Sequence, residues 1–129
     1  MDLFRHLNML SKKINFQKKF SKFSQKWSPR VIGEMNDYQF KIVKINGDFV
    51  WHSHKDTDET FIVIEGNMSI KFRNGEVQLS EGEMFIVRKG VEHKPSSKQE
   101  CKVLLVEPKG VINTGDAGGK FTVKEDVWI

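Results

Sequence analysis

Short runs of β-branched and aromatic residues fill most of this chain from Val31 onward. Turn-forming residues separate the runs about every eight to twelve positions, a spacing typical of all-β sandwiches and barrels. The predicted strands lie near residues 31–35, 39–45, 48–52, 60–65, 67–73, 76–79, 83–87, 91–94 and 101–107. Because a chain of 129 residues has the length of one domain, we expect a single small β-barrel with roughly six to eight core strands.

One hairpin can be predicted in detail, within "MSIKFRNGEVQL". Asn74 and Gly75 suit a two-residue type I′ turn, because both residue types tolerate a positive φ angle. A turn at that position pairs Ile70 with Leu79. The apolar side chains of the two strands then share one face, and the polar side chains share the other.

The predicted strands near 60–65 and 83–87 are apolar on both faces. A strand that is buried on both sides needs a cover on its outer face as well as a filled interior. We therefore expect the N-terminal segment, another sheet or a partner subunit to cover the outside of the barrel. This is the main reason to predict a homodimer.

Residues 1–27 form a basic extension. They carry seven basic residues and a single acidic one, whereas the rest of the chain has fourteen basic and sixteen acidic residues. The net charge of +4 therefore describes the extension, and nucleic acid is not an expected partner of the folded body. A basic arm can still contact nucleic acid or another acidic surface.

Apolar residues recur at helical spacing within this extension and predict a short helix over roughly residues 2–13. A second apolar face is predicted to dock on the domain; it consists of Phe16, Phe20, Phe23 and Trp27. A solvated, partly disordered extension is the alternative. The chain is thus divided into a basic N-terminal extension over 1–27, a β-barrel over 28–110, and a C-terminal tail over 111–129 that packs on the barrel or on a partner.

The sequence also bears on location. No apolar run approaches the roughly 20 residues that a membrane-spanning helix needs, and the first residues lack the pattern of a secretory signal. Cys101 is the only cysteine, so no intrachain disulfide can form, and its apolar neighbours predict a buried, unreactive thiol. We expect a cytoplasmic protein that does not bind membranes.

The segment "VWHSHKDTDET" places His52 and His54 two positions apart, with Glu59 five positions further on. Side chains two apart in a strand lie on the same face, so both imidazoles can face the barrel interior. Glu59, at the start of the next strand, and His93, in "VEHKP", have the parity to join them. Three imidazoles and one carboxylate suit a divalent Fe, Mn, Ni, Cu or Zn ion. A polar surface turn is the competing interpretation of the His-X-His pair taken alone.

The wider spacing resembles the two conserved motifs of the cupin superfamily. "GDFVWHSHKDTDETFIVIEG" is similar to the first motif, which has a glycine, His-X-His, a glutamate and a closing glycine, and "GEMFIVRKGVEH" is similar to the second. The gap after Gly47 is one residue short, while Arg88 and Ser97 stand where proline and asparagine are usual. Those two positions mainly shape a turn, and all four ligand positions are filled. The resemblance covers roughly residues 31–108.

This resemblance implies a double-stranded β-helix, or jelly-roll, barrel that holds one divalent transition metal. The implied metal ligands are His52, His54, Glu59 and His93. Cupin-like barrels bind small molecules in their interior, so side chains predicted to face inward are pocket candidates. These candidates are Phe61, Phe72, Met84 and Ile86.

Two functions are compatible with such a centre. The first is a metalloenzyme of the dioxygenase, isomerase or lyase type that acts on a small oxygen-bearing substrate. The alternative is a non-catalytic module that binds a sugar or a hydroxy acid, and a purely structural barrel with vestigial histidines is a third hypothesis. No further acidic residue has the parity and neighbours to be assigned as a general base, so the catalytic residues are unassigned.

Overall fold

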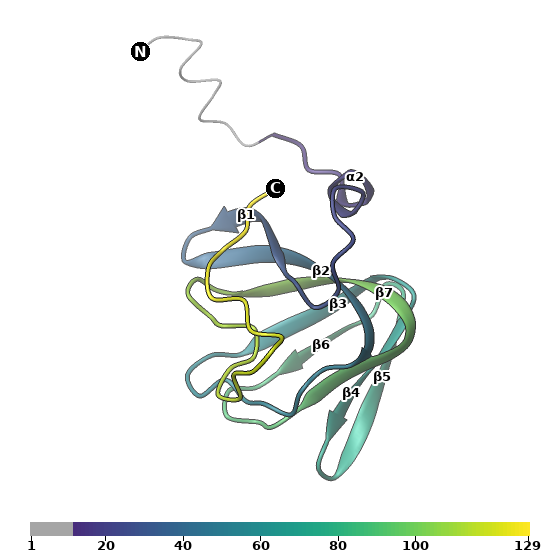
Figure 1. Ribbon diagram of the computed structural model, residues 1–129, viewed down its shortest axis with the longest axis vertical. Helices are drawn as coiled ribbons and strands as arrows, with labels where there is room; N and C mark the ends of the chain where they lie inside the picture. Colours follow the sequence, from purple (N-terminus) through teal and green to yellow (C-terminus); the bar gives the residue numbers. More distant parts are fainter. Residues whose placement is uncertain (1–11) are drawn as a thin grey trace.

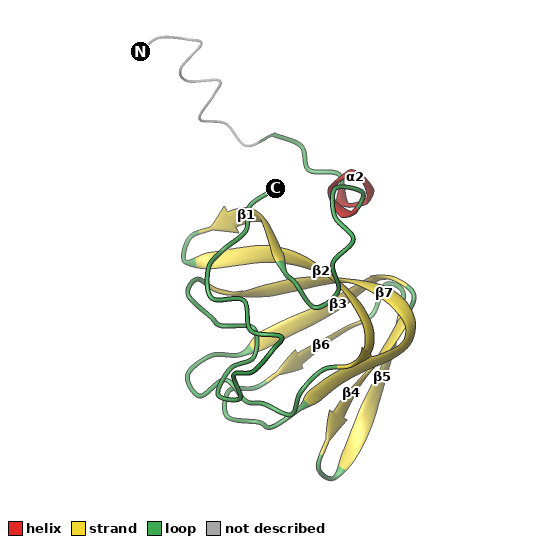
Figure 2. Cartoon of the chain, viewed as in Figure 1, coloured by secondary structure: helices red, strands yellow, loops and turns green. Residues whose placement is uncertain are grey.

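The computed structural model describes residues 12–129 and is built almost entirely from strands (Figures 1 and 2). Within these residues there is one short helix, α2 (Phe16–Phe20), and there are seven strands. The strands are β1 (Arg30–Met35), β2 (Tyr38–Asp48), β3 (Glu59–Glu65), β4 (Asn67–Phe72), β5 (Gly75–Ser80), β6 (Met84–Val87) and β7 (Lys94–Pro108). The prediction of an all-β barrel is confirmed. Most of the helix predicted over 2–13 lies outside the described residues.

The longest strand, β7, organises the sheet. Along one edge it pairs antiparallel with β2 from Ser96 to Pro108, and along the other edge its C-terminal half pairs with β3, so that the order is β1-β2-β7-β3-β6. Its N-terminal end pairs instead with β4, which forms a hairpin with β5. Figure 2 shows how the strands curl around a common interior as β7 bends from one group of strands to the other.

Two predicted strand boundaries are wrong, and β7 accounts for one of them. The strand predicted over 101–107 begins earlier, at Lys94, because the residues before 101 also find pairing partners. Of the strand predicted near 91–94, only Lys94 belongs to a strand. The strand predicted over 48–52 does not form either. Instead β2 continues to Asp48, and the chain then turns into a loop. The Phe49 N–H of this loop donates to the Pro95 carbonyl oxygen of β7 at 2.9 Å, and His52 forms an isolated bridge with His93.

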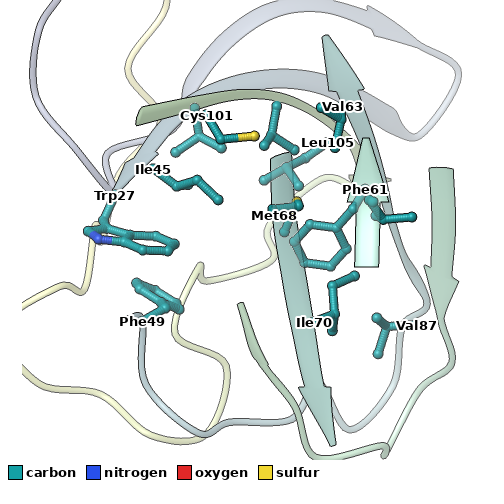
Figure 3. Packing of buried hydrophobic residues seen from close by; sticks show 13 residues of the cluster. Trp27, Ile45, Phe49, Phe61, Val63, Met68, Ile70, Val87, Cys101 and Leu105 are labelled. Carbon is teal, nitrogen blue, oxygen red and sulfur yellow. The ribbon is translucent and has the colours of Figure 1, made fainter. Parts of the chain in front are cut away.

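The barrel interior is filled by alternate residues of β2, β3 and β7, as Figure 3 shows. Val63, Cys101 and Val103 are almost fully buried there. Burial also raises the pKa of the Cys101 thiol to about 11, which fits the predicted unreactive thiol.

The N-terminal segment covers part of the outer face of the sheet. Phe20 is completely buried in a second apolar cluster that includes Ile42 of β2 and Leu104 of β7. Phe23 joins this cluster, so the predicted docking face is present at these positions. Trp27 departs from it: the chain leaves the helix after Phe20, and Trp27 packs into the inner core with a positive φ of 60°.

The β4–β5 hairpin has the predicted faces but not the predicted turn. Ile70 pairs with Val77, not with Leu79, and the turn lies at Arg73 and Asn74. We attribute the shift to packing, because Leu79 then lies opposite Met68, where both side chains are buried in the core. The slip is two residues, so each side chain keeps its face.

The chain after β7 returns across the barrel. Near its end it runs beside β1, where the Val31 N–H donates to the carbonyl oxygen of Val127 at 2.8 Å. Figure 1 shows this yellow segment passing over the loops that connect the strands. None of the helices in residues 12–129 is long and apolar enough to cross a membrane.

Candidate metal centre

Two of the histidines are brought together by the backbone. His52 and His93 exchange hydrogen bonds: each backbone N–H donates to the carbonyl oxygen of the other, at 3.0 and 2.9 Å. Their ring centroids lie 4.3 Å apart. Since residues that exchange both backbone hydrogen bonds lie directly opposite each other, this bridge sets the two imidazoles side by side.

The other two residues approach the same point. His54 lies in the loop after the bridge, where its carbonyl oxygen accepts a hydrogen bond of 2.8 Å from the Gly90 N–H. Glu59 is the first residue of β3 and points into the barrel together with Phe61. All four side chains are buried, and one potential ligand atom of each lies within 4.8 Å of the others. The structure thus places the four sequence-predicted residues in one cluster.

The hydrogen bonds of two histidines fix which ring nitrogen is free. Nδ1 of His52 lies 2.9 Å from the carbonyl oxygen of Val50, and Nδ1 of His93 lies 2.9 Å from that of Val91. A carbonyl oxygen only accepts, so Nδ1 of each ring carries the proton. Nε2 is then left with a lone pair, which is the arrangement that metal-binding histidines show.

Two of the imidazole Nε2 atoms have no hydrogen-bond partner among residues 12–129. Nε2 of His54 and Nε2 of His93 are buried without a hydrogen bond, and each lies 3.6 Å from Oε1 of Glu59. That distance is too long for a good hydrogen bond, and buried polar atoms without partners are rare in native proteins. A divalent ion among these atoms would satisfy them, so the residues present fit a metal with a three-nitrogen, one-oxygen donor set.

The protonation states also suit a metal. Burial, together with the neighbouring His93, lowers the pKa of His52 to about 4. Burial acts to raise the pKa of Glu59, but the adjacent imidazoles of His54 and His93 outweigh it and bring the pKa below its ordinary value. At neutral pH these two residues are a neutral imidazole and a carboxylate, the forms that bind metals.

An acidic residue that the sequence analysis did not identify lies next to this cluster. Glu107 of β7 is buried beside Glu59, and its Oε1 atom lies 3.0 Å from Nζ of Lys41 of β2. Burial raises the pKa of Glu107 well above the ordinary value, the Glu59 charge raises it further, and Lys41 opposes both. The expectation that no further acid has the correct parity is therefore wrong. Glu107 has the parity of the buried Val103 and Leu105, which is the signal that could have found it.

A small cavity of about 30 Å³ lies beside His52 and Glu59. It has room for about two water molecules. Most of its wall is apolar, with Trp27, Phe49, Phe61, Met68 and Leu105 among the lining residues and Asn113 as a polar one. Figure 3 shows Trp27 and Phe49 on one side of this space and Phe61 across from them.

The four predicted pocket residues have different positions. Phe61 lines the cavity, whereas Phe72 packs at the edge of the core with its ring centroid 5.9 Å from that of Phe85. Met84 and Ile86 face the opposite way from the prediction. Glu59 pairs with Val87 and Phe61 with Phe85, so Phe85 and Val87 face inward, and Met84 is 58% exposed on the outside.

The C-terminal tail closes one side of the centre. The Asp116 carboxylate accepts hydrogen bonds from the Ser53 backbone N–H at 2.8 Å and from its hydroxyl at 3.2 Å. Gly115, with a φ of 53°, lies so close to Ser53 that a Cβ atom would overlap the Ser53 carbonyl oxygen and approach the His52 ring to 3.2 Å. The tail therefore holds the turn between His52 and His54 in place.

A jelly-roll barrel with three histidines and one glutamate at its interior defines the class of this protein. The cupin domain family matches residues 40–107, more than half of the chain, and the protein belongs to this family. The crystal structure of a cupin-2 domain containing protein from Shewanella frigidimarina is similar, with 61% sequence identity and a TM-score of 0.74 over 74% of this chain and 94% of that one.

Two further relatives are less similar. A crystal structure of a Neisseria meningitidis protein has 33% identity and a TM-score of 0.70, covering 76% of this chain and all of that one. The uncharacterized protein YdbB of Bacillus subtilis (strain 168) is 35% identical over 79 residues, which span 60% of this chain and 70% of the Bacillus protein.

Proposed function

We propose that this cupin binds one divalent transition metal through His52, His54, Glu59 and His93 and acts as a metalloenzyme on a small oxygen-bearing substrate. The observation that carries the proposal is the pair of buried Nε2 atoms without partners, both directed at one carboxylate oxygen. A bound Fe, Mn, Ni, Cu or Zn ion would supply Lewis acidity or redox chemistry there. The proposed reaction is of the dioxygenase, isomerase or lyase type.

The roles of the protein side chains follow from their positions. The backbone carbonyls of Val50 and Val91 hold the His52 and His93 rings in the ligating tautomer. Glu59 supplies the anionic oxygen, and Phe61 forms part of an apolar wall that keeps bulk water away from the centre. Since the cavity holds only about two waters, we expect a larger substrate to bind only when part of this wall moves.

The alternative is a non-catalytic module that holds a sugar, a hydroxy acid or another small ligand. What favours it is the lining of the cavity: within residues 12–129, its only titratable side chains are the proposed ligands His52 and Glu59. Turnover distinguishes the two functions. A panel of hydroxy acids, thiols, phenols and sugar phosphates that yields no product from the metal-loaded protein, while one member binds, would favour the module.

Metal analysis of the purified protein tests both forms of the proposal. We expect about one equivalent of a transition metal after reconstitution. His54→Ala and Glu59→Ala should lose most of it while the circular dichroism spectrum of the fold is kept. Glu65→Ala is the matched control, since Glu65 lies on the same strand but is exposed. A wild-type protein that takes up no metal would refute the proposed centre.

We further propose that the protein is a homodimer, as the sequence analysis expected. Met84 is 58% exposed and Tyr38 is 47% exposed on the outer side of the barrel, and an apolar surface that is left uncovered often marks an interface. Light scattering coupled to size-exclusion chromatography measures the mass directly. A mass of one chain at micromolar concentration would contradict the dimer. The cytoplasmic location also stays a proposal, and cell fractionation tests it.

A further inference from the structure

A buried ion pair lies inside the barrel, beyond the four proposed ligands. The Lys41 Nζ atom is 3.0 Å from Oε1 of Glu107, and the two side chains are only 7% and 2% exposed. Lys41 also donates to the carbonyl oxygen of Val111 at 3.5 Å. These two side chains are among the few charged groups in an interior that is otherwise filled by apolar residues of β2, β3 and β7.

The strand register explains why the pair lies beside the metal centre. Gln39 is opposite Glu107 across β2 and β7, and Thr60 is opposite Val106 across β7 and β3. The next position along β3 is Glu59, so Glu107 has Glu59 on one side and the β2 residues on the other. The register therefore sets the two residues next to each other, and β-sheet geometry leaves both carboxyl groups on the inner face.

Folding alone does not explain this pair. Removing a lysine and a glutamate from water costs free energy that their attraction often fails to recover, and apolar replacements of similar volume are frequently neutral or stabilising. Glu107 also lies against another carboxylate, which repels it unless a positive charge is near. Lys41 supplies that charge on the side of Glu107 that is turned to β2. A role for this ion pair in fixing the neighbouring Glu59 side chain would explain why the pair is buried there.

We infer that Lys41 and Glu107 are positioning residues that hold the carboxylate of Glu59 toward the imidazoles of the proposed metal centre. The inference rests on the proposed function, because it assigns a role relative to that centre. Oε1 of Glu59 lies 3.6 Å from Nε2 of both His54 and His93, and a small rotation of the carboxylate would change both distances. A neighbouring group that is itself fixed by Lys41 restricts this rotation, as residues behind a metal ligand commonly do.

The test is a double variant that removes the pair, Lys41→Met with Glu107→Leu. The measurements are the dissociation constant for Co(II), from titration against a competing chelator, and the melting temperature of the metal-free protein. We expect the dissociation constant to rise about 10- to 100-fold and the visible Co(II) spectrum to change, because the position of an oxygen ligand changes. The melting temperature should stay the same or rise.

A matched control is available on the outer side of β7 and β3. Lys102 of β7 and Glu65 of β3 lie 2.8 Å apart, with side chains 20% and 52% exposed. The variant Lys102→Met with Glu65→Leu should leave the Co(II) dissociation constant and the spectrum unchanged. The single variant Glu107→Gln keeps a group that can hydrogen-bond to Glu59, and we expect it to bind Co(II) more tightly than Glu107→Leu.

The outcomes separate this inference from the proposed function. If the wild-type protein binds Co(II) and the Lys41→Met/Glu107→Leu variant binds it with the same constant and spectrum, the positioning role is refuted and the metal centre stands. If the variant loses thermal stability and keeps its affinity, the pair is structural, and the inference is again wrong. If the wild-type protein binds no Co(II), both proposals fail together.

Discussion

His52 makes the stability of the metal-free protein depend on pH below neutrality. Its pKa falls from an ordinary value of 6.5 to about 4 in the folded protein, mainly because the ring is buried. In the unfolded chain the ring is hydrated and takes up a proton near its ordinary pKa. Between these two values the unfolded state therefore binds more protons than the folded state, and stability is lost as the pH falls.

The size of the effect follows from the two pKa values. One pKa unit corresponds to 1.36 kcal/mol, so the difference between 6.5 and about 4 corresponds to about 3 kcal/mol of unfolding free energy. This contribution is fully present above pH 6.5 and is lost as the pH falls through about 4. It is a large share of the stability of a small domain, which is about 5–15 kcal/mol.

Urea denaturation of the chelator-treated protein at several pH values between 7.5 and 4.5 measures this dependence. The variant His52→Asn should remove most of it, because an asparagine amide can still donate to the Val50 carbonyl but does not titrate. The comparison with the variant is needed because the pKa values of Glu59 and Glu107 are also shifted, in opposite directions. If the wild-type protein and His52→Asn lose stability equally over this range, the argument from burial is refuted.

Three further predictions follow from packing. Gly115→Ala and Gly118→Ala both place a side chain at positive φ, but only Gly115 lies against Ser53. We expect each to lower the unfolding free energy by about 1 kcal/mol through backbone strain, and Gly115→Ala to lower it by about 1–3 kcal/mol more and to weaken metal binding. Equal effects of the two variants on urea denaturation and on metal titration would contradict the contact. Phe20→Ala should lower the unfolding free energy by about 3–5 kcal/mol, measured by urea denaturation, whereas Phe16→Ala, at a position 36% exposed, should cost far less. Cys101 should react with a thiol reagent only at the rate of unfolding, because its side chain is completely buried and its pKa of about 11 leaves little thiolate. Fast reaction of the native protein would show that the thiol is accessible.

The candidate centre was predictable because the alternation of side chains along an extended backbone does not depend on where a strand is predicted to begin or end. His52 and His54 lie in a loop rather than in a strand, yet an extended backbone alternates its side chains in the same way. The hairpin shows the same point: its register slipped by two residues, and Ile70 and Leu79 still face the core.

The alternation of side chains does not predict which face is buried where a strand is apolar on both faces. In β6, Met84 and Phe85 are equally apolar, and only the pairing of Phe61 with Phe85 decides which of them faces inward. Glu107 was missed for the opposite reason. A charged residue just before Pro108 resembles the exposed end of a strand, and only its pairing with the buried Lys41 shows that the charge is inside.

The bridge between His52 and His93 joins segments that are distant in the sequence, and β3 brings Glu59 to them from a third segment. All four ligand atoms come together only in the folded chain, so an ion that binds there binds the native state much more tightly than the unfolded state. Such an ion stabilises the native state by an amount that grows with the logarithm of its free concentration. The lifetime of this protein in a cell, under continual proteolysis of unfolded chains, would then follow the supply of the metal that it holds.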